Sequence, residues 1–150
     1  MTAFNRRVLL GGALASLLPL CVRAQAGVWV ITTAEAAMPP SQASRAGRSI
    51  TRGPAIRQVS PAGPVASNQP FALRIDFAAR GGEKINPASA QVRVLRGGTV
   101  DVTQRLAPFI RPTGIDVPNA MVPPGTYVIE VAVSDAGGRQ SVANIEIDAK

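Results

Sequence analysis

Large apolar residues alternate with polar or small residues along much of the chain after residue 55. In residues 71–77, the side chains of Phe71, Leu73, Ile75 and Phe77 fall on one face, with smaller or charged side chains on the other. A period of two residues is the spacing of a half-buried strand. This pattern predicts a strand with one face in a hydrophobic core.

The C-terminal part of the chain repeats this alternation twice. Residues 127–133 place Tyr127 and three β-branched residues on one face, and residues 141–148 place one alanine and two isoleucines on one face. Between these runs, Asp135 and the glycines that follow it supply a turn. We therefore predict a long closing hairpin.

Weaker alternation predicts four further strands, and a Gly-Gly pair after residue 96 supplies a tight reversal between two of them. No apolar period of 3.6 residues separates these runs, so strands follow one another through turns. The sequence thus predicts an all-β fold, an antiparallel immunoglobulin-like sandwich of about seven strands over residues 55–150. The weaker strands are expected at residues 56–60, 89–96, 99–106 and 115–117.

Residues 27–54 precede this predicted domain and have a different character. Residues 27–33 are β-prone and contain the only tryptophan, Trp29, whereas residues 34–54 are rich in Ala, Ser, Arg, Gly and Pro. Apart from a short helix-prone stretch at 33–38, this composition predicts a linker or irregular arm. Residues 28–31 have two interpretations: an extra edge strand of the chain's own sandwich, or a strand offered to the sheet edge of a partner.

Residues 1–26 have the three-part layout of a secretory signal peptide. A polar start with Arg6 and Arg7 is followed by an apolar run over 8–20 and by Ala-Gln-Ala, which predicts cleavage after Ala26. The apolar run is shorter than the roughly 20 residues that a permanent span needs, so no stable membrane span is expected after cleavage. The paired arginines leave the twin-arginine and general secretory routes open. Either route predicts a periplasmic protein.

The formal net charge of +7 is unevenly distributed along the chain, and this distribution decides what it implies about partners. The predicted signal peptide holds three of the sixteen basic residues, so the mature chain keeps thirteen against nine acidic ones. Arg45, Arg48, Arg52 and Arg57 lie in a stretch dotted with proline and glycine, without interleaved aromatic residues. This is typical of a solvated arm, and nucleic acid is not a predicted partner.

Residue types limit the chemistry that is open to the chain. There is no histidine, and the single cysteine, Cys21, lies in the predicted signal peptide. Disulfides within the mature monomer and histidine or thiolate metal sites are therefore excluded. Lys84 and Lys150 are the only lysines and fall in a turn and at the terminus, and most carboxylates fall on outward strand faces. We predict no enzyme activity, no cofactor and no metal site.

Two segments carry a resemblance to known families. Residues 59–63, Val-Ser-Pro-Ala-Gly, and residues 122–127, Val-Pro-Pro-Gly-Thr-Tyr, resemble those of bacterial immunoglobulin-like domains and of periplasmic CopC-like copper-binding sandwiches. The resemblance covers roughly residues 56–149. It implies a sandwich in which the Tyr127 hydroxyl is tied back to the backbone. The copper role is not implied, because the histidines that such proteins use are missing here.

The predicted function is that of a non-enzymatic interaction module, which contacts an unknown envelope protein. Its candidate partner-binding residues are Trp29, Arg45, Arg48 and Arg52. One alternative is a CopC-like carrier of a small ligand or metal that has lost its histidine ligands. Another is a structural protein whose basic arm rests on anionic lipid or peptidoglycan.

Overall fold

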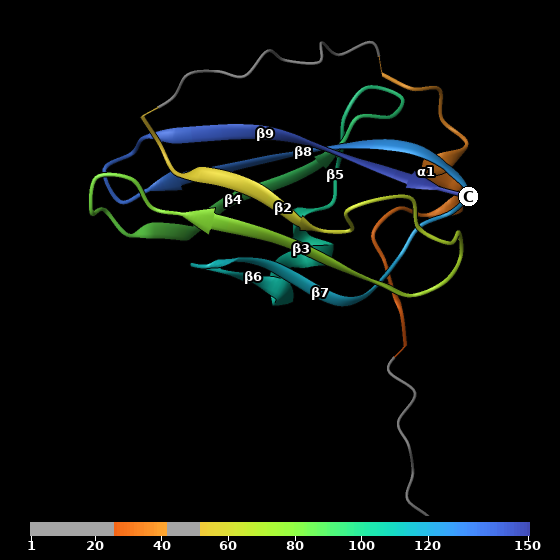
Figure 1. The fold of residues 1–150 in the computed structure, drawn as a ribbon. Coiled ribbons are helices and arrows are strands. Elements are labelled where there is room, and N and C mark those ends of the chain that lie inside the picture. The colour runs from red at the N-terminus through yellow and green to blue at the C-terminus, as the bar shows by residue number, and fades with distance from the viewer. Residues whose placement is uncertain (1–25, 42–51) are drawn as a thin grey trace, which may run out of the picture.

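A computed structural model describes residues 26–41 and 52–150, and within these residues nine strands form two packed sheets (Figure 1). The predicted all-β sandwich is confirmed. The first sheet has the order β1 (Val28–Trp29), β7 (Gly114–Met121), β3 (Phe71–Ala78), β2 (Ala55–Ser60), with β6 (Ile110–Arg111) also paired to β7. The second sheet has the order β5 (Val100–Asp101), β4 (Ile85–Val94), β8 (Gly125–Asp135), β9 (Gln140–Ala149).

The predicted closing hairpin is confirmed as β8 and β9. The two strands pair without interruption from Gly125 opposite Ala149 to Ser134 opposite Gln140. Their inward positions are buried, among them Tyr127, Ile129, Val131, Ile145 and Ile147. Outward positions alternate with these, which places Val128 directly opposite Glu146 on the outer face of the second sheet.

The core lies between the sheets. Strand β3 contributes Leu73, Ile75 and Phe77, as its alternation predicts, and these belong to one buried cluster with the inward residues of β8 and β9. Burying one such side chain completely stabilises the fold by roughly 1.5–3 kcal/mol. The core therefore depends on residues that are far apart in the sequence.

The predicted strand at 99–106 is largely wrong. Only Val100–Asp101 forms a strand, and the chain continues as helix α2 (Thr103–Leu106) and the 3₁₀ turn η1 (Ala107–Phe109). The Asp101 carboxylate accepts a hydrogen bond from the Thr103 backbone N–H at 2.8 Å, which turns the chain out of the sheet. Val102 and Leu106 are buried at helical spacing, so one face of this turn completes the core.

Residues 26–41, here called the strap, include the predicted β-prone run and the first part of the predicted arm, and they pack against the sandwich. Strand β1 pairs with β7 in parallel, the exception in an otherwise antiparallel pairing of the described strands, and this confirms an edge strand at Val28–Trp29. The next two residues, Val30 and Ile31, have no exposed surface. Helix α1 (Thr33–Ala36) follows, and Pro40 then bridges to Arg96 beside the second sheet. The strap therefore contacts both sheets.

One expectation falls outside the described residues, and another is addressed by them. The predicted signal peptide lies in residues that the structure does not describe, apart from Ala26, so its cleavage remains a prediction. Among the described residues, the structure contains no helix with the length and apolar character that crossing a bilayer requires.

Candidate interaction site

The structure does not bring the predicted partner-binding residues together. Trp29 lies on β1 with 37% of its surface exposed, and Arg52 is exposed just before β2. Because β1 and β2 are the opposite edges of the first sheet, these two side chains belong to different sides of the molecule. Arg45 and Arg48 lie outside the described residues.

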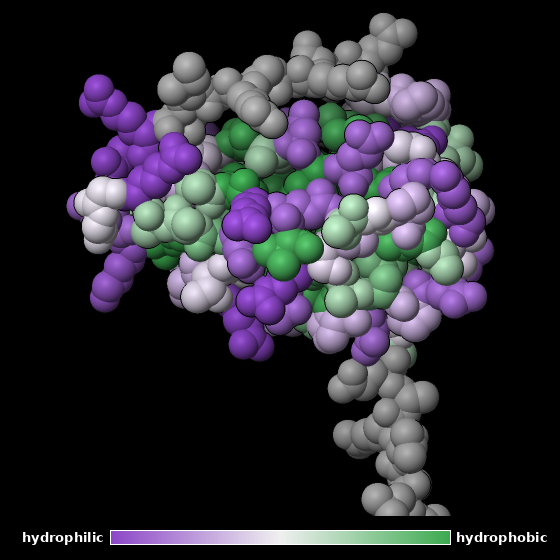
Figure 2. Space-filling view, in the orientation of Figure 1, coloured by the Kyte–Doolittle hydropathy of each residue, from purple (hydrophilic) through white to green (hydrophobic). Residues whose placement is uncertain are grey.

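Exposed apolar side chains are scattered rather than gathered. Among the described residues, the large ones are Trp29, Met38, Val59 and Val142, and they come from β1, the strap beyond α1, β2 and β9. On the face that carries β2 and β3, Figure 2 shows small apolar areas separated by polar side chains. This face offers no broad apolar patch, so a hollowed site is the better candidate.

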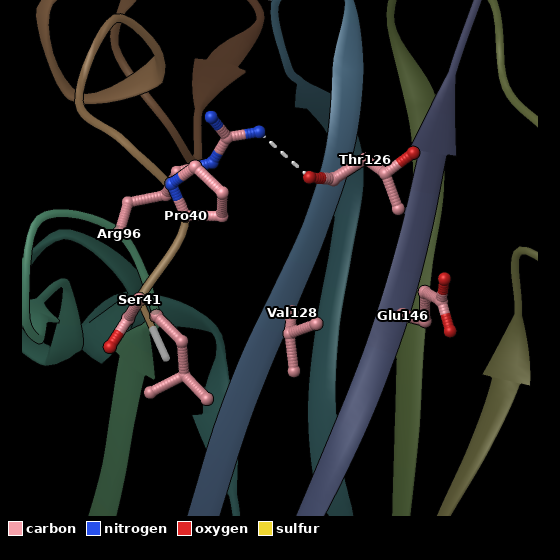
Figure 3. Close-up of a pocket in the computed structure, with 7 residues that line it drawn as sticks. Pro40, Ser41, Arg96, Thr126, Val128 and Glu146 are labelled. Carbon is pink, nitrogen blue, oxygen red and sulfur yellow. Dashed lines mark hydrogen bonds between the residues drawn. The ribbon is translucent and has the colours of Figure 1, made fainter. Parts of the chain in front are cut away.

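A groove of about 370 Å³ lies on the outer face of the second sheet, beside the end of the strap. Its volume falls in the range of ligand pockets, roughly 300–1,000 Å³. Figure 3 shows the Val128 side chain between Ser41 on one side and Glu146 on the other. The lining residues are Pro40, Ser41, Leu95, Arg96, Thr126, Val128 and Glu146.

Backbone hydrogen bonds hold the strap against the end of β4 and so form one wall of this groove. The Leu95 N–H donates to Val128 O at 2.9 Å, and Leu95 O accepts from the Ser41 N–H at 3.3 Å. The Gly97 N–H donates to Pro39 O at 2.8 Å. Leu95 is consequently only 7% exposed although it lines the groove, and it forms an apolar floor with Val128.

Arg96 fixes the upper end of the groove. Its guanidinium donates to Ala36 O at 3.2 Å and to Met38 O at 3.1 Å in the strap, and to Thr126 O at 2.8 Å in β8 (Figure 3). It also lies 4.8 Å from the centre of the Tyr127 ring, a cation–π distance. The groove wall is therefore tied at three carbonyls before any ligand arrives.

The predicted tie of Tyr127 to the backbone is present in the structure. Its hydroxyl donates to Pro124 O at 3.0 Å, three residues earlier. Burial raises the pKa of this hydroxyl, and the nearby Arg96 cation opposes that rise. Tyr127 thus stays protonated and supports Arg96 from below.

An ion pair between Glu35 and Arg105 secures the strap at another point. Thr32 and Glu35 form a capping box at the start of α1, and Arg105 of α2 binds both carboxylate oxygens of Glu35 at 2.9 and 3.1 Å and also donates to Val30 O at 2.8 Å. The hydrogen bond from Arg105 lowers the pKa of Glu35 to about 2. The strap is therefore held by a carboxylate that stays ionised.

Glu146 differs from the other charged groups around the groove. It is exposed, and it has no ion-pair partner among the described residues. It also lines a second hollow of about 420 Å³ on the other side of β9. That hollow is otherwise lined by Gln58, Val59, Pro61, Ala62, Gly63, Pro64 and Asp148. Glu146 therefore carries the uncommitted charge between two hollows.

The side chains that line the groove are suited to binding a ligand. The groove lining includes no cysteine, histidine or lysine that would pair with Ser41 as a nucleophile and base. The described part of the chain contains no group of three or more His, Cys, Asp or Glu side chains placed to hold a metal ion. What the groove offers is an apolar floor, a wall held by Arg96 and one carboxylate.

Sequence reasoning missed Arg96, Arg105 and the groove. The sequence did carry a signal for the start of helix α1 in the strap, because Thr32 and Glu35 have the spacing of a capping box. Arg96 gave no such signal, since its acceptors are backbone carbonyls 30 to 60 residues away.

Comparison with known proteins gives one structural likeness. No family model matches the chain, and comparison with curated protein sequences finds no significant match. A crystal structure of CopC from Methylosinus trichosporium OB3b is similar over 63% of this chain and 95% of that chain, with 17% sequence identity and a TM-score of 0.39. This likeness does not assign the chain to a family.

Proposed function

We propose that this chain is an exported, non-enzymatic periplasmic domain, which binds another envelope protein through the groove beside β8 and β9. The observation that carries the proposal is the preformed wall. Arg96 joins the strap to Thr126 and fixes the groove, while Leu95 and Val128 offer an apolar floor. A preformed hollow with an apolar floor and a few placed polar side chains can receive a side chain or an extended segment of a partner.

The use of charge in the described residues supports binding over catalysis. The Glu35 carboxylate is hydrogen-bonded by Arg105. The buried Asp135 carboxylate accepts hydrogen bonds from the backbone N–H and the side chain of Arg139 at 2.9 and 2.8 Å. Burial opposes ionisation of Asp135, but these hydrogen bonds outweigh it and lower its pKa. Both groups stabilise the fold, and neither lines the groove.

The carrier alternative has less support from the described residues. Met38 and Met121 are the methionines that they include, and each packs against a glycine, Gly97 and Gly27 respectively. Two thioethers without a histidine or thiolate make a poor copper site. Calorimetric titration with copper and calcium tests this alternative, and measurable heats of binding would move it ahead of the protein-binding proposal.

The export part of the proposal rests on the sequence of residues 1–26. Its test is the intact mass of the protein recovered from the periplasm of the producing cell. A chain that begins at Gly27 is the expected result, and a chain that keeps residues 1–26 in the cytoplasm would contradict export.

The binding part is tested by affinity capture of the tagged mature protein from its own envelope after mild cross-linking. Val128→Arg fills the groove with a long side chain and is expected to abolish capture of a specific partner. Asn144→Arg is the matched control, because Asn144 is exposed on the same face of β9 but does not line the groove. Equal capture by both variants would place the binding surface elsewhere.

A further inference from the structure

We propose that the groove binds an extended peptide segment that carries a lysine or arginine, with its cation on Glu146 and the apolar side chains two residues to each side of it in the hollows beside β9. This inference rests on the proposed protein-binding function and names the chemistry of the partner.

The sign of the charge follows from which groups are already committed. Arg96 is the other charged side chain in the groove, and its guanidinium is bound to Ala36 O, Met38 O and Thr126 O. Glu146 has no ion-pair partner among the described residues and stands at the opposite side of Val128 from Ser41 (Figure 3). The donors of Arg96 are therefore already occupied, whereas the Glu146 carboxylate can still form an ion pair, so it attracts a ligand's cation and repels an acidic side chain.

Two neighbouring carboxylates also lie on this face, but each already has a partner and is less available to a ligand's cation than Glu146. Asp148, two residues along the same face, is shared with Lys150 at 3.5 Å and with the Thr126 hydroxyl at 3.3 Å. Glu130, two residues from Val128 on β8, lies 3.6 Å from Arg93. Glu146 is thus the carboxylate on this part of the face that is left for a partner.

The shape of the surface indicates an extended segment rather than a single small cation. Glu146 lines both hollows, the groove floored by Leu95 and Val128 and the hollow that contains Val59 and several small or proline residues. A cation on Glu146 therefore has an apolar floor on one side and, on the other, a hollow in which apolar residues stand beside Gln58 and Asp148. An extended peptide fits such an arrangement, because side chains two residues apart point to the same side of its backbone, so those on either side of the cation can enter the two hollows.

The test is an NMR titration of the isotope-labelled mature protein with the peptide acetyl-Val-Ala-Arg-Ala-Val-amide. Two matched probes carry citrulline or glutamate in place of the arginine, and citrulline keeps the shape of arginine without its charge. We expect amide shifts that cluster at Leu95, Val128 and Glu146. The arginine peptide is expected to bind about two- to fivefold more tightly than the citrulline peptide, and the glutamate peptide more weakly than both.

Protein variants locate this preference. Glu146→Gln is expected to remove the difference between the arginine and citrulline peptides, whereas Asp116→Asn, an exposed acid on the other sheet, is expected to keep it. Equal affinities of the three peptides for the unaltered protein, or a preference that survives Glu146→Gln, would overturn the proposal. Binding of acetyl-arginine-amide as tight as that of the peptide would overturn its peptide part.

A last variant tests the chain's own arginines as the occupant. If the double substitution Arg45→Ala with Arg48→Ala shifts the Val128 and Glu146 amides of the unliganded protein, the groove is filled by its own chain and the proposal is wrong. An unchanged spectrum at these two amides supports an external partner. Failure of the charge preference with intact envelope capture would overturn only this inference, and failure of capture would overturn the proposed function.

Discussion

The strap and strand β9 use their carboxylates in opposite ways. In the strap, the Glu35 side chain is 13% exposed and is bound by Arg105 and by the Thr32 N–H. On the outer face of β9, Glu146 is exposed beside the groove, and the described residues provide it with no ion-pair partner. A charge that is neutralised inside the fold contributes to stability, whereas a charge left open at a preformed hollow contributes to recognition.

This contrast separates the residues that support the site from those that contact a ligand. Val30, Ile31, Glu35 and Arg96 place the strap, and the strap supplies Pro40 and Ser41 to the groove. Substitutions in the first group are therefore expected to change unfolding, and substitutions at Glu146 to change binding alone.

The largest effect is expected for Ile31→Ala. Ile31 is fully buried in the common core, so its truncation leaves a cavity and should lower the free energy of unfolding by about 2–5 kcal/mol. Urea denaturation followed by circular dichroism measures this. Trp29→Ala, on the exposed part of β1, is the control with a smaller loss. Equal losses for both variants would mean that the strap is not anchored by its buried residues.

The next effect is a pH dependence that the Glu35–Arg105 pair produces. The folded-state pKa of Glu35 is lowered from 4.5 to about 2, so its stabilisation is complete above pH 4.5 and is lost as the pH falls from 4.5 towards 2. Glu35→Gln should reduce the free energy of unfolding by about 1–3 kcal/mol at pH 7 and by less at pH 3. Urea titrations at the two pH values measure the difference. The same loss at both pH values would show that the charge of Glu35 does not contribute.

A smaller effect is expected for Arg96→Met, which keeps an unbranched apolar stem but removes the donors of the guanidinium. The loss of three bonds to carbonyls should lower stability by about 1–2 kcal/mol. Hydrogen exchange locates the change, and faster exchange is expected at the Ser41 and Gly97 amides, which bond across the strap contact. Unchanged exchange at these amides would separate Arg96 from the docking of the strap.

The smallest effect on stability is expected for Glu146→Gln. An exposed side chain without an ion pair should change the free energy of unfolding by no more than about 0.5 kcal/mol. The same urea titration at pH 7 measures it beside Glu35→Gln, an identical chemical change in the strap. A loss as large as that of Glu35→Gln would remove the distinction between the two carboxylates.

The sequence predicts the parts of the fold that are encoded locally. Alternation along a single strand is visible in the sequence, and it predicts strands β3, β8 and β9. The hydrogen bond of the Tyr127 hydroxyl to the backbone is implied by the resemblance of residues 122–127 to immunoglobulin-like and CopC-like domains. For residues 28–31 an edge strand of the chain's own sandwich was one of two interpretations, because four apolar residues do not reveal a partner strand about 90 residues away at Ala120 and Met121. Helix α2 was missed because one turn with two buried residues is too short to show a period.

The candidate site was less predictable than the fold. Its lining comes from the strap, the end of β4, β8 and β9, which meet only after the sandwich closes. The groove wall is held by hydrogen bonds from Arg96 to backbone carbonyls, and every residue has such a carbonyl, so the sequence does not reveal which ones accept. Glu146 looks like any outward strand residue until the hollows on both sides of it are seen.

The central claim is that the groove beside Glu146 contacts another protein, and photo-cross-linking in the intact envelope tests it most directly. Benzoylphenylalanine is placed at Asn144, which is exposed beside the groove without lining it, in one variant and at Asp116, on the outer face of the other sheet, in a second. The account predicts a protein adduct of defined mass from position 144 only, which diminishes when Glu146→Gln is added. Equal adducts from both positions, or none from position 144, would contradict it.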